Sequence, residues 1–281
     1  MTRVSMCSQY RVALWAALFL LIFGFSRFAV AEIAPEQLKD LPEADIVLLG
    51  EVHDNPWHHE NQAQILQHLR PPAVVFEMLS AEQAAQANSH IGGISDLRRL
   101  LQWDDSGWPD FSLYAPVFEA IGPAQVYGMA VPREDLRRVF ETPLADAFGQ
   151  DAIRFGLDQP LPPEEQTTRE ARQLAVHCDA LPEEYLPAMV AAQRYRDAAF
   201  ARTALEALAE HGGPIAVIVG TGHVHPDWGM PALLAIAAPE VVVLSVGQFE
   251  TAAPTGPVYD LTLVTEAAER PDPCAQFRND G

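Results

Sequence analysis

Three short apolar runs in this chain each lead directly into ionisable side chains. The runs are rich in Val, Ile and Leu and do not alternate with polar residues, so each predicts a strand that is buried on both faces. Such strands belong to parallel sheets, whose carboxyl ends lie along one edge, where ligands bind. The three runs, with the ionisable residues that end or follow them, are 45–50 with Glu51 and His53, 72–77 with Glu77, and 214–220 with His223.

Predicted helices alternate with these strands. Ile65, Leu66 and Leu69 have helical spacing, and Ser80 with Gln83 resembles the capping box that opens a further helix. The β–α–β order predicts an α/β fold with a parallel-rich central sheet flanked by helices. The expected strands are 45–50, 72–77, 124–130, 214–220, 240–246 and 258–264.

The middle of the chain has a helical pattern that ends at Gly212-Gly213, a typical C-cap signal. We therefore expect an inserted, smaller all-helical subdomain between two parts of the α/β core. The predicted division is a signal peptide at 1–31, the core at 32–133 and 210–281, and the helical subdomain at 134–209.

The first residues have the pattern of a secretory signal peptide. Arg3 and Arg11 precede an apolar stretch, and Ala29-Val30-Ala31 forms a small-residue cleavage signal. We expect an exported protein that is periplasmic or envelope-associated, with an uncleaved N-terminal anchor as the alternative. The apolar stretch is shorter than the roughly 20 residues that span a bilayer. No cysteine directly follows the cleavage signal, so no acylation point for a lipoprotein is evident.

The charge balance excludes one class of partner. The whole chain has a formal net charge of −20, and removing residues 1–31 takes away three arginines and no acidic residue, so the predicted mature chain is more negative still. Such a surface repels nucleic acid and anionic membrane, so we expect no nucleic-acid partner. The mature chain keeps Cys178 and Cys274, which predict a disulfide in an oxidising compartment, with two buried free thiols as the alternative.

The four ionisable residues at the strand ends form the candidate site. Glu51 and His53 are two residues apart, so in extended backbone they point to the same side. Together with Glu77 and His223 they could bind a divalent metal that keeps one position open for water. The alternative is an ionic network that only joins the strand ends. His58, His59 and His225 lie nearby in sequence and could extend the site, although each one singly is expected to be a solvated loop or helix histidine.

Two further patterns limit the possible functions. Trp103, Trp108, Phe111, Tyr114 and Phe118 crowd the segment 91–120, which predicts core packing, or alternatively a platform for a flat ligand. The sequence has no G-x-S-x-G motif, no P-loop, no G-x-G-x-x-G after a strand and no zinc-finger spacing. The sequence therefore gives no support for a serine hydrolase with that nucleophile motif, a P-loop or dinucleotide-binding protein, or a zinc finger.

Taken together, several segments resemble the ChaN family of haem-binding, iron-regulated bacterial proteins in the Tiki/TraB-like superfamily. The resemblance implies a parallel sheet flanked by helices, a small helical domain and haem binding at the cell envelope. It also implies dimers that hold stacked haems between subunits. Family members are often lipoproteins, which this sequence does not match. The segments that carry the resemblance are 48–66, 75–83, 108–117, 192–201 and 219–234.

The first functional hypothesis is therefore an exported haem-binding protein in haem or iron acquisition, with haem as cofactor. Its partners would be a haem-linked second copy and an envelope haem receptor or transporter. Haem iron accepts tyrosine as an axial ligand, and Tyr114 and Tyr195 are the candidates because they lie in the aromatic and helical segments. The second hypothesis is a metal-dependent hydrolase, protease-like or esterase-like, that uses the four strand-end residues. The third is a binding module for another flat or apolar ligand.

Overall fold

The computed structural model describes residues 31–90, 92–253 and 259–278. Its strands form one seven-stranded sheet in the order β1-β7-β6-β2-β5-β3-β4, and every neighbouring pair is parallel. The α/β class predicted from the sequence is thus confirmed. The strands are β1 (Ala31–Glu32), β2 (Ile46–Glu51), β3 (Ala73–Phe76), β4 (Gln125–Gly128), β5 (Ile215–Gly220), β6 (Val243–Glu250) and β7 (Leu261–Thr265).

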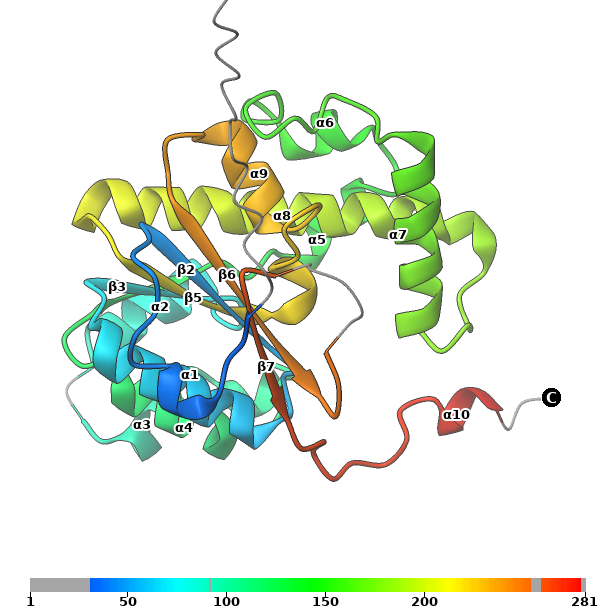
Figure 1. Cartoon of the computed structure of the whole chain (residues 1–281). Helices are drawn as coiled ribbons and strands as arrows, with labels where there is room; N and C mark the ends of the chain where they lie inside the picture. Colours follow the sequence, from blue (N-terminus) through cyan, green and yellow to red (C-terminus); the bar gives the residue numbers. More distant parts are fainter. Residues whose placement is uncertain (1–30, 91, 254–258, 279–281) are drawn as a thin grey trace, which may run out of the picture.

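Helices cover both faces of the sheet, as Figure 1 shows. The α-helices of the described residues are α1 (Pro56–Leu69), α2 (Ala81–Asn88), α3 (Ile94–Leu100), α4 (Phe111–Ala120), α5 (Arg133–Arg138), α6 (Leu144–Phe148), α7 (Pro163–Val176), α8 (Leu186–His211), α9 (Met230–Ala237) and α10 (Ala275–Arg278). Short 3-10 helices are η1 (Pro35–Gln37), η2 (Trp103–Asp105), η3 (Glu183–Tyr185) and η4 (Thr221–His223). None of the described helices is both long and apolar enough to cross a membrane.

Each face of the sheet has its own hydrophobic core. On one face, Val47, Val74 and Ile218 of the central strands pack with Leu66 of α1 and Val117 of α4. The alternate residues of the same strands point to the other face, as the twofold period of a strand requires. These residues join side chains of α8 and α9, so the fold has three layers.

Residues 134–209, the expected helical subdomain, pack against the sheet. The region is helical, but it has no separate core. Phe148 and Phe155 join the same cluster as Val75 of β3 and Val217 of β5, and α8 supplies the buried alanines between them. The physical reason is that the Ala-rich face of α8 lies against the sheet, so this helix is a layer of the α/β core and not part of an appended unit.

The strand predictions were accurate for β2, β3, β4 and β5, whereas β6 and β7 begin later than expected. β6 continues to Glu250 although Ser245 and Gln248 are polar and buried. Both side chains are satisfied by hydrogen bonds, since Ser245 donates to the carbonyl of Val224 and Gln248 donates to that of Gly50 (2.8 Å). The predicted signal peptide lies outside the described residues apart from Ala31, which belongs to β1.

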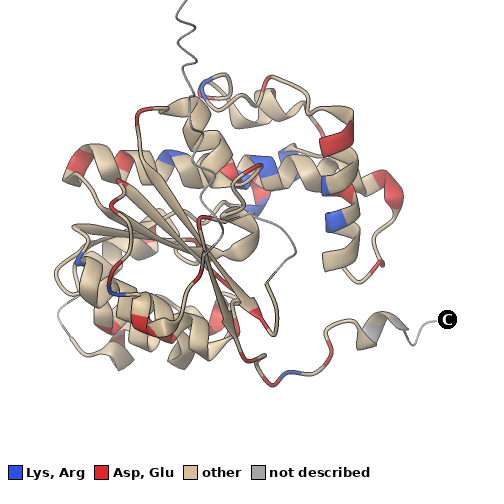
Figure 2. Cartoon of the chain, in the orientation of Figure 1, with Lys and Arg blue, Asp and Glu red and all other residues tan. Residues whose placement is uncertain are grey.

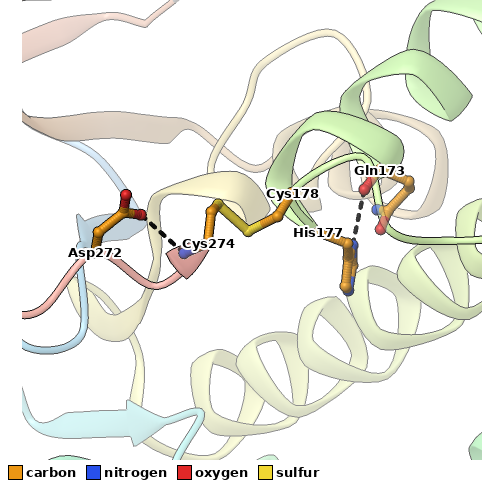
Figure 3. Close-up of a disulfide and its surroundings, with 5 residues drawn as sticks. All are labelled: Gln173, His177, Cys178, Asp272 and Cys274. Atoms are coloured by element: carbon orange, nitrogen blue, oxygen red, sulfur yellow. Dashed lines mark hydrogen bonds between the residues drawn. A yellow bond between two sulfur atoms is a disulfide. The ribbon is translucent and has the colours of Figure 1, made fainter. Parts of the chain in front are cut away.

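The predicted disulfide is present (Figure 3). Cys178 lies just after α7 and Cys274 just before α10, and their sulfur atoms are 2.03 Å apart. Asp272 accepts a hydrogen bond from the backbone N–H of Cys274 (2.8 Å). The C-terminal segment is thereby attached to the end of α7.

Candidate functional site

The four predicted site residues lie together at the carboxyl edge of the sheet. Glu51 ends β2, Glu77 directly follows β3, and His223 lies in η4, which follows β5. These three strands are adjacent in the order β2-β5-β3, so their ends meet. The expected convergence of the four residues is visible in their mutual contacts.

Glu51 and His53 form the first pair of the site. His53 Nδ1 lies 2.7 Å from Glu51 Oε1, and the Tyr114 hydroxyl donates to the same oxygen at 2.6 Å. Gln62 of α1 donates to the other oxygen, Oε2, at 2.7 Å. Glu51 is almost fully buried, so these donors replace the water that its carboxylate has lost.

Glu77 lies between the two imidazoles. Its Oε2 accepts the backbone N–H of Gly220 at 2.7 Å and is 3.8 Å from His53 Nε2. Its Oε1 is 3.5 Å from His223 Nε2. A single carboxylate therefore links the ends of all three strands.

His223 is fixed on its other side by α8. Its Nδ1 lies 2.6 Å from Asp197 Oδ1 and 2.9 Å from Gln193 Nε2. The Phe200 ring lies 4.9 Å from the imidazole, centroid to centroid. Asp197 is completely buried, and Arg169 of α7 approaches its other oxygen to 3.9 Å. The array is thus a chain of alternating carboxylates and cations that is buried except at the half-buried His53.

Protonation follows from these neighbours. Burial alone would lower the pKa of His223, but the carboxylates of Glu77 and Asp197 raise it to about 10. Burial would raise the pKa of Glu77, but the charge and hydrogen bond of His223, together with His53 and the Gly220 amide, lower it to about 2. His53 also has a raised pKa, because Glu51 and Glu77 outweigh its burial. At neutral pH the structure therefore holds an imidazolium against a carboxylate.

The protonation of the outer carboxylates is set by the same balance. Burial raises the pKa of Asp197 and is only partly offset by His223 and Arg169. Burial also acts to raise the pKa of Glu51, but His59, His53 and Tyr114 together bring it below its usual value. Chemically, the array can hold protons, and exchange them, at a water-poor edge of the sheet.

A cavity of about 490 Å³ opens beside this array, and we call it the site cavity. Glu77 and His223 lie in its wall, with Trp108 and Phe200 as large aromatic surfaces. The Trp108 ring is 4.7 Å from the His53 ring, centroid to centroid. A volume of this size is within the range of small-molecule sites. The remaining lining residues are Ser106, Gly107, Ala130, Val131, Arg133, Leu136 and Arg196.

The aromatic segment at 91–120 is mostly core. Trp103, Phe111, Tyr114 and Phe118 are buried and pack on one another. Trp108 differs from the rest, because it lies at the surface of the site cavity. The platform interpretation therefore applies to Trp108 alone.

The predictions for the neighbouring histidines were wrong. His58, His59 and His225 were expected to be solvated, but all three are buried. His58 accepts the N–H of Val52 at Nδ1 (2.8 Å), and burial lowers its pKa to about 4. His59 lies 3.5 Å from Glu51 Oε2 and supports the first pair. Histidine spacing alone could not show that α1 packs its imidazole face against the end of β2.

The structure does not place the two candidate haem ligands within reach of a ligand. Tyr114 is fully buried, and its hydroxyl is used by Glu51. Tyr195 is also buried and packs edge-on against Phe148, 5.0 Å between centroids. Within the described residues, Tyr185 is the tyrosine with an exposed side chain, at 49%.

The hypothesis of a divalent-metal site is not supported by the donor geometry. Across the described ranges, no group of three or more His, Cys, Asp and Glu side chains is arranged to hold a metal ion. Glu51 directs its oxygens to Tyr114, Gln62 and His53, and Glu77 lies between two imidazoles. The carboxylates are thus already satisfied by protein donors.

Sequence reasoning missed the residues that α7 and α8 contribute. Asp197, Gln193 and Arg169 complete the array around His223, yet they come from helices far along the chain. The available signal was an aspartate on an otherwise Ala-rich stretch of α8, since a buried acid requires a partner.

A three-layer α/β protein with a charged array at its strand ends is thus the class that fold and site define. Residues 37–234 match the family model described as "Haem-binding uptake, Tiki superfamily, ChaN". The chain belongs to this family.

Comparison with solved structures agrees on the fold. The chain resembles a structure described as "Cofacial heme binding to ChaN of Campylobacter jejuni", with 20% identity, a TM-score of 0.59, and coverage of 78% of this chain and 85% of that one. It also matches the type III effector HopBA1, at 16% identity and a TM-score of 0.41, over 79% of this chain and 88% of the effector. No match was found among curated protein sequences.

Proposed function

We propose that this protein is an exported haem-binding protein of the cell envelope that takes part in haem or iron acquisition. The observation that carries the proposal is the match of residues 37–234 to the haem-binding uptake family. Export is supported by the signal-peptide pattern at 1–31, and an oxidising compartment by the disulfide.

The residues present suit a flat, apolar and anionic ligand. The site cavity offers Trp108 and Phe200 as aromatic surfaces, with Arg133 and Arg196 as cations. Porphyrin iron would need an axial ligand, and tyrosine is one of the side chains that supply it. We propose Tyr185 for this role in place of Tyr114 and Tyr195, because its side chain is exposed. Tyr185 is the last residue of η3 and directly precedes α8.

A second copy of the chain is a proposed partner. The neighbour from Campylobacter jejuni is described as binding haem cofacially, that is, with haems face to face. An exposed tyrosine at the start of α8 would allow two bound haems to stack between subunits. An envelope haem receptor or transporter would then be the source or the acceptor of the haem.

Haem titration of the purified mature protein tests the proposal. For the wild type we expect a shifted Soret band at a near-stoichiometric ratio of haem to protein. For Tyr185→Phe we expect a changed spectrum and a haem affinity that is lower by about tenfold or more. Tyr195→Phe serves as the matched control, because its side chain is buried against Phe148. No spectral change with the wild type would refute haem binding. An unchanged Tyr185→Phe spectrum would refute only the ligand assignment.

A further inference from the structure

A second cavity adjoins the site cavity. It has a volume of about 350 Å³ and lies between α7, α8 and the segment that follows η4. We call it the arginine pocket, because Arg169, Arg172 and Arg196 line it. Arg196 also lines the site cavity, so the two cavities meet at this side chain. The remaining lining residues are Gln173, Val176, His177, Met189, Gln193, Gly222 and Trp228.

The arginine pocket is cationic in a strongly acidic protein. The chain has 38 acidic residues against 18 basic ones, yet no described carboxylate lines this pocket. Figure 2 shows several blue segments, with red ones among them, where α7 approaches the middle of α8. Among the residues that the structure describes, Arg172 and Arg196 have no ion pair within 4.0 Å. Concentrated, unpaired positive charge at one cavity is what an anionic ligand requires.

The pocket also contains a buried N–H donor that makes no hydrogen bond. Arg169 is only 5% exposed, and its Nη1 donates to Glu165 at 3.3 Å. Its Nη2 has no hydrogen bond and stays 3.9 Å from Asp197 Oδ2, which is itself unsatisfied. A buried N–H without an acceptor is rare and costly in proteins. A ligand oxygen in the pocket would supply that acceptor.

Apolar side chains complete the pocket. Val176, Met189 and Trp228 line it, and the Trp228 ring stacks on His225 at 3.6 Å between centroids. Gln193 links the pocket to the charged array, because its amide contacts His223 Nδ1. The pocket therefore combines cations at one end with flat apolar surface, which suits the carboxylate-bearing edge of an aromatic molecule.

We propose that the arginine pocket binds the carboxylate groups of the protein's ligand, and that Arg172 and Arg196 are the residues that recognise them. This inference rests on the proposed function in one respect: in a haem-binding protein those carboxylates are the two propionates. The planar guanidinium of arginine pairs with a carboxylate through two parallel hydrogen bonds, which lysine cannot do. The protein should therefore bind a porphyrin with two free carboxylates more tightly than the neutral ester of the same porphyrin.

The test compares haem with haem dimethyl ester, in which both carboxylates are blocked, by absorption titration at fixed ionic strength. We expect wild type to bind haem about tenfold or more tightly than the ester. Arg172→Gln and Arg196→Gln should each weaken haem binding by about tenfold and reduce that preference, with little effect on the ester. The matched control is Arg99→Gln, which removes the same charge from an 83% exposed side chain of α3.

The outcomes separate the two proposals. Equal affinity for acid and ester, or full-strength haem binding by both pocket variants, would overturn the carboxylate assignment and leave haem binding intact. If wild type binds no haem, the proposed function fails. Thermal unfolding with citrate or inorganic phosphate then decides this inference. If citrate or phosphate stabilises the wild type but not Arg172→Gln or Arg196→Gln, the pocket binds the anionic groups of a ligand other than haem. If neither anion stabilises the wild type, the proposed carboxylate recognition is overturned.

Discussion

At the scale of single residues, each buried charge of the site needs an oppositely charged neighbour, because water cannot compensate it there. His223 lies between Glu77 and Asp197, and all three are buried, so removing one partner leaves the others without compensation. Breaking such a buried pair typically destabilises a protein by about 3–5 kcal/mol. The array is therefore part of what joins α8 to the strand ends.

The charge of His223 predicts how stability changes at alkaline pH. Its pKa is about 10 in the folded protein, against an ordinary 6.5. The folded state keeps a proton that the unfolded state releases above pH 6.5, so this contribution is complete below pH 6.5 and is lost as the pH rises towards 10. We expect the free energy of unfolding to fall across this window, by at most about 1.4 kcal/mol per pH unit.

Urea unfolding between pH 6 and 10 measures this dependence. His223→Gln should show a shallower alkaline slope than wild type, while His68→Gln, which changes an exposed histidine of α1, should keep the wild-type slope. Identical slopes for His223→Gln and wild type would contradict the raised pKa of His223.

The residues also show how much of the site a sequence can reveal. Glu51, His53, Glu77 and His223 could be predicted because each directly follows or ends a strand, and strand ends of a parallel sheet meet. Asp197 could not be predicted as the partner of His223, since the direction of one face of α8 depends on packing. The contact between the Tyr114 hydroxyl and Glu51 could not be predicted either, because nothing in the local sequence shows that this side chain reaches the end of β2.

At the scale of elements, two glycines let the ends of β2 and β5 approach their neighbours. A Cβ at Gly50 would lie 2.9 Å from the backbone oxygen of Val246 in β6. A Cβ at Gly220 would lie 2.9 Å from Nε2 of His53, which is the far end of a side chain. The Val246 oxygen is fixed because it belongs to the backbone of β6, whereas the His53 ring can move because it is a side chain. A methyl group added at Gly50 should therefore have a different effect from one added at Gly220.

We therefore expect Gly50→Ala to destabilise the protein by about 1–3 kcal/mol, as overpacking of a well-packed core does. Gly220→Ala should cost clearly less but displace the His53 ring. Urea unfolding measures the first effect, and the imidazole resonances of His53 in NMR spectra measure the second. A larger loss of stability for Gly220→Ala than for Gly50→Ala would refute this distinction.

Elements differed in how well they could be predicted. β2, β3 and β5 are continuous apolar runs and were found within a residue or two. β6 was placed too early, because its buried Ser245 and Gln248 resemble the end of a strand until their acceptors are known. The alanines of α8 likewise do not reveal from the sequence that the surface beneath them is the sheet.

At the scale of the whole molecule, the disulfide connects parts that are far apart in sequence. Cys178 and Cys274 are separated by 96 residues. A disulfide that closes a loop of that length reduces the conformational entropy of the unfolded chain and could thereby stabilise the folded protein by up to about 4–5 kcal/mol, although engineered disulfides often contribute less. The link should therefore stabilise the attachment of the C-terminal segment to the end of α7.

We expect a reductant to lower the melting temperature of the wild type, and Cys178→Ser together with Cys274→Ser to reproduce that lower value. The double variant should then be insensitive to reductant, which separates loss of the bond from other effects of the reagent. An unchanged melting temperature on reduction, with loss of the bond verified by mass spectrometry, would show that the connection does not contribute to stability.

The C-terminal segment is also attached at a second point. Arg270 forms an ion pair with Asp54 at 2.7 Å and a hydrogen bond with Glu250 at 2.8 Å, next to the loop that carries His53. Four residues later, Cys274 joins the end of α7, the helix that supplies two arginines to the arginine pocket. One short stretch of chain thus connects the loop after β2 with the end of α7, and a protease that cut between Arg270 and Cys274 would remove that connection.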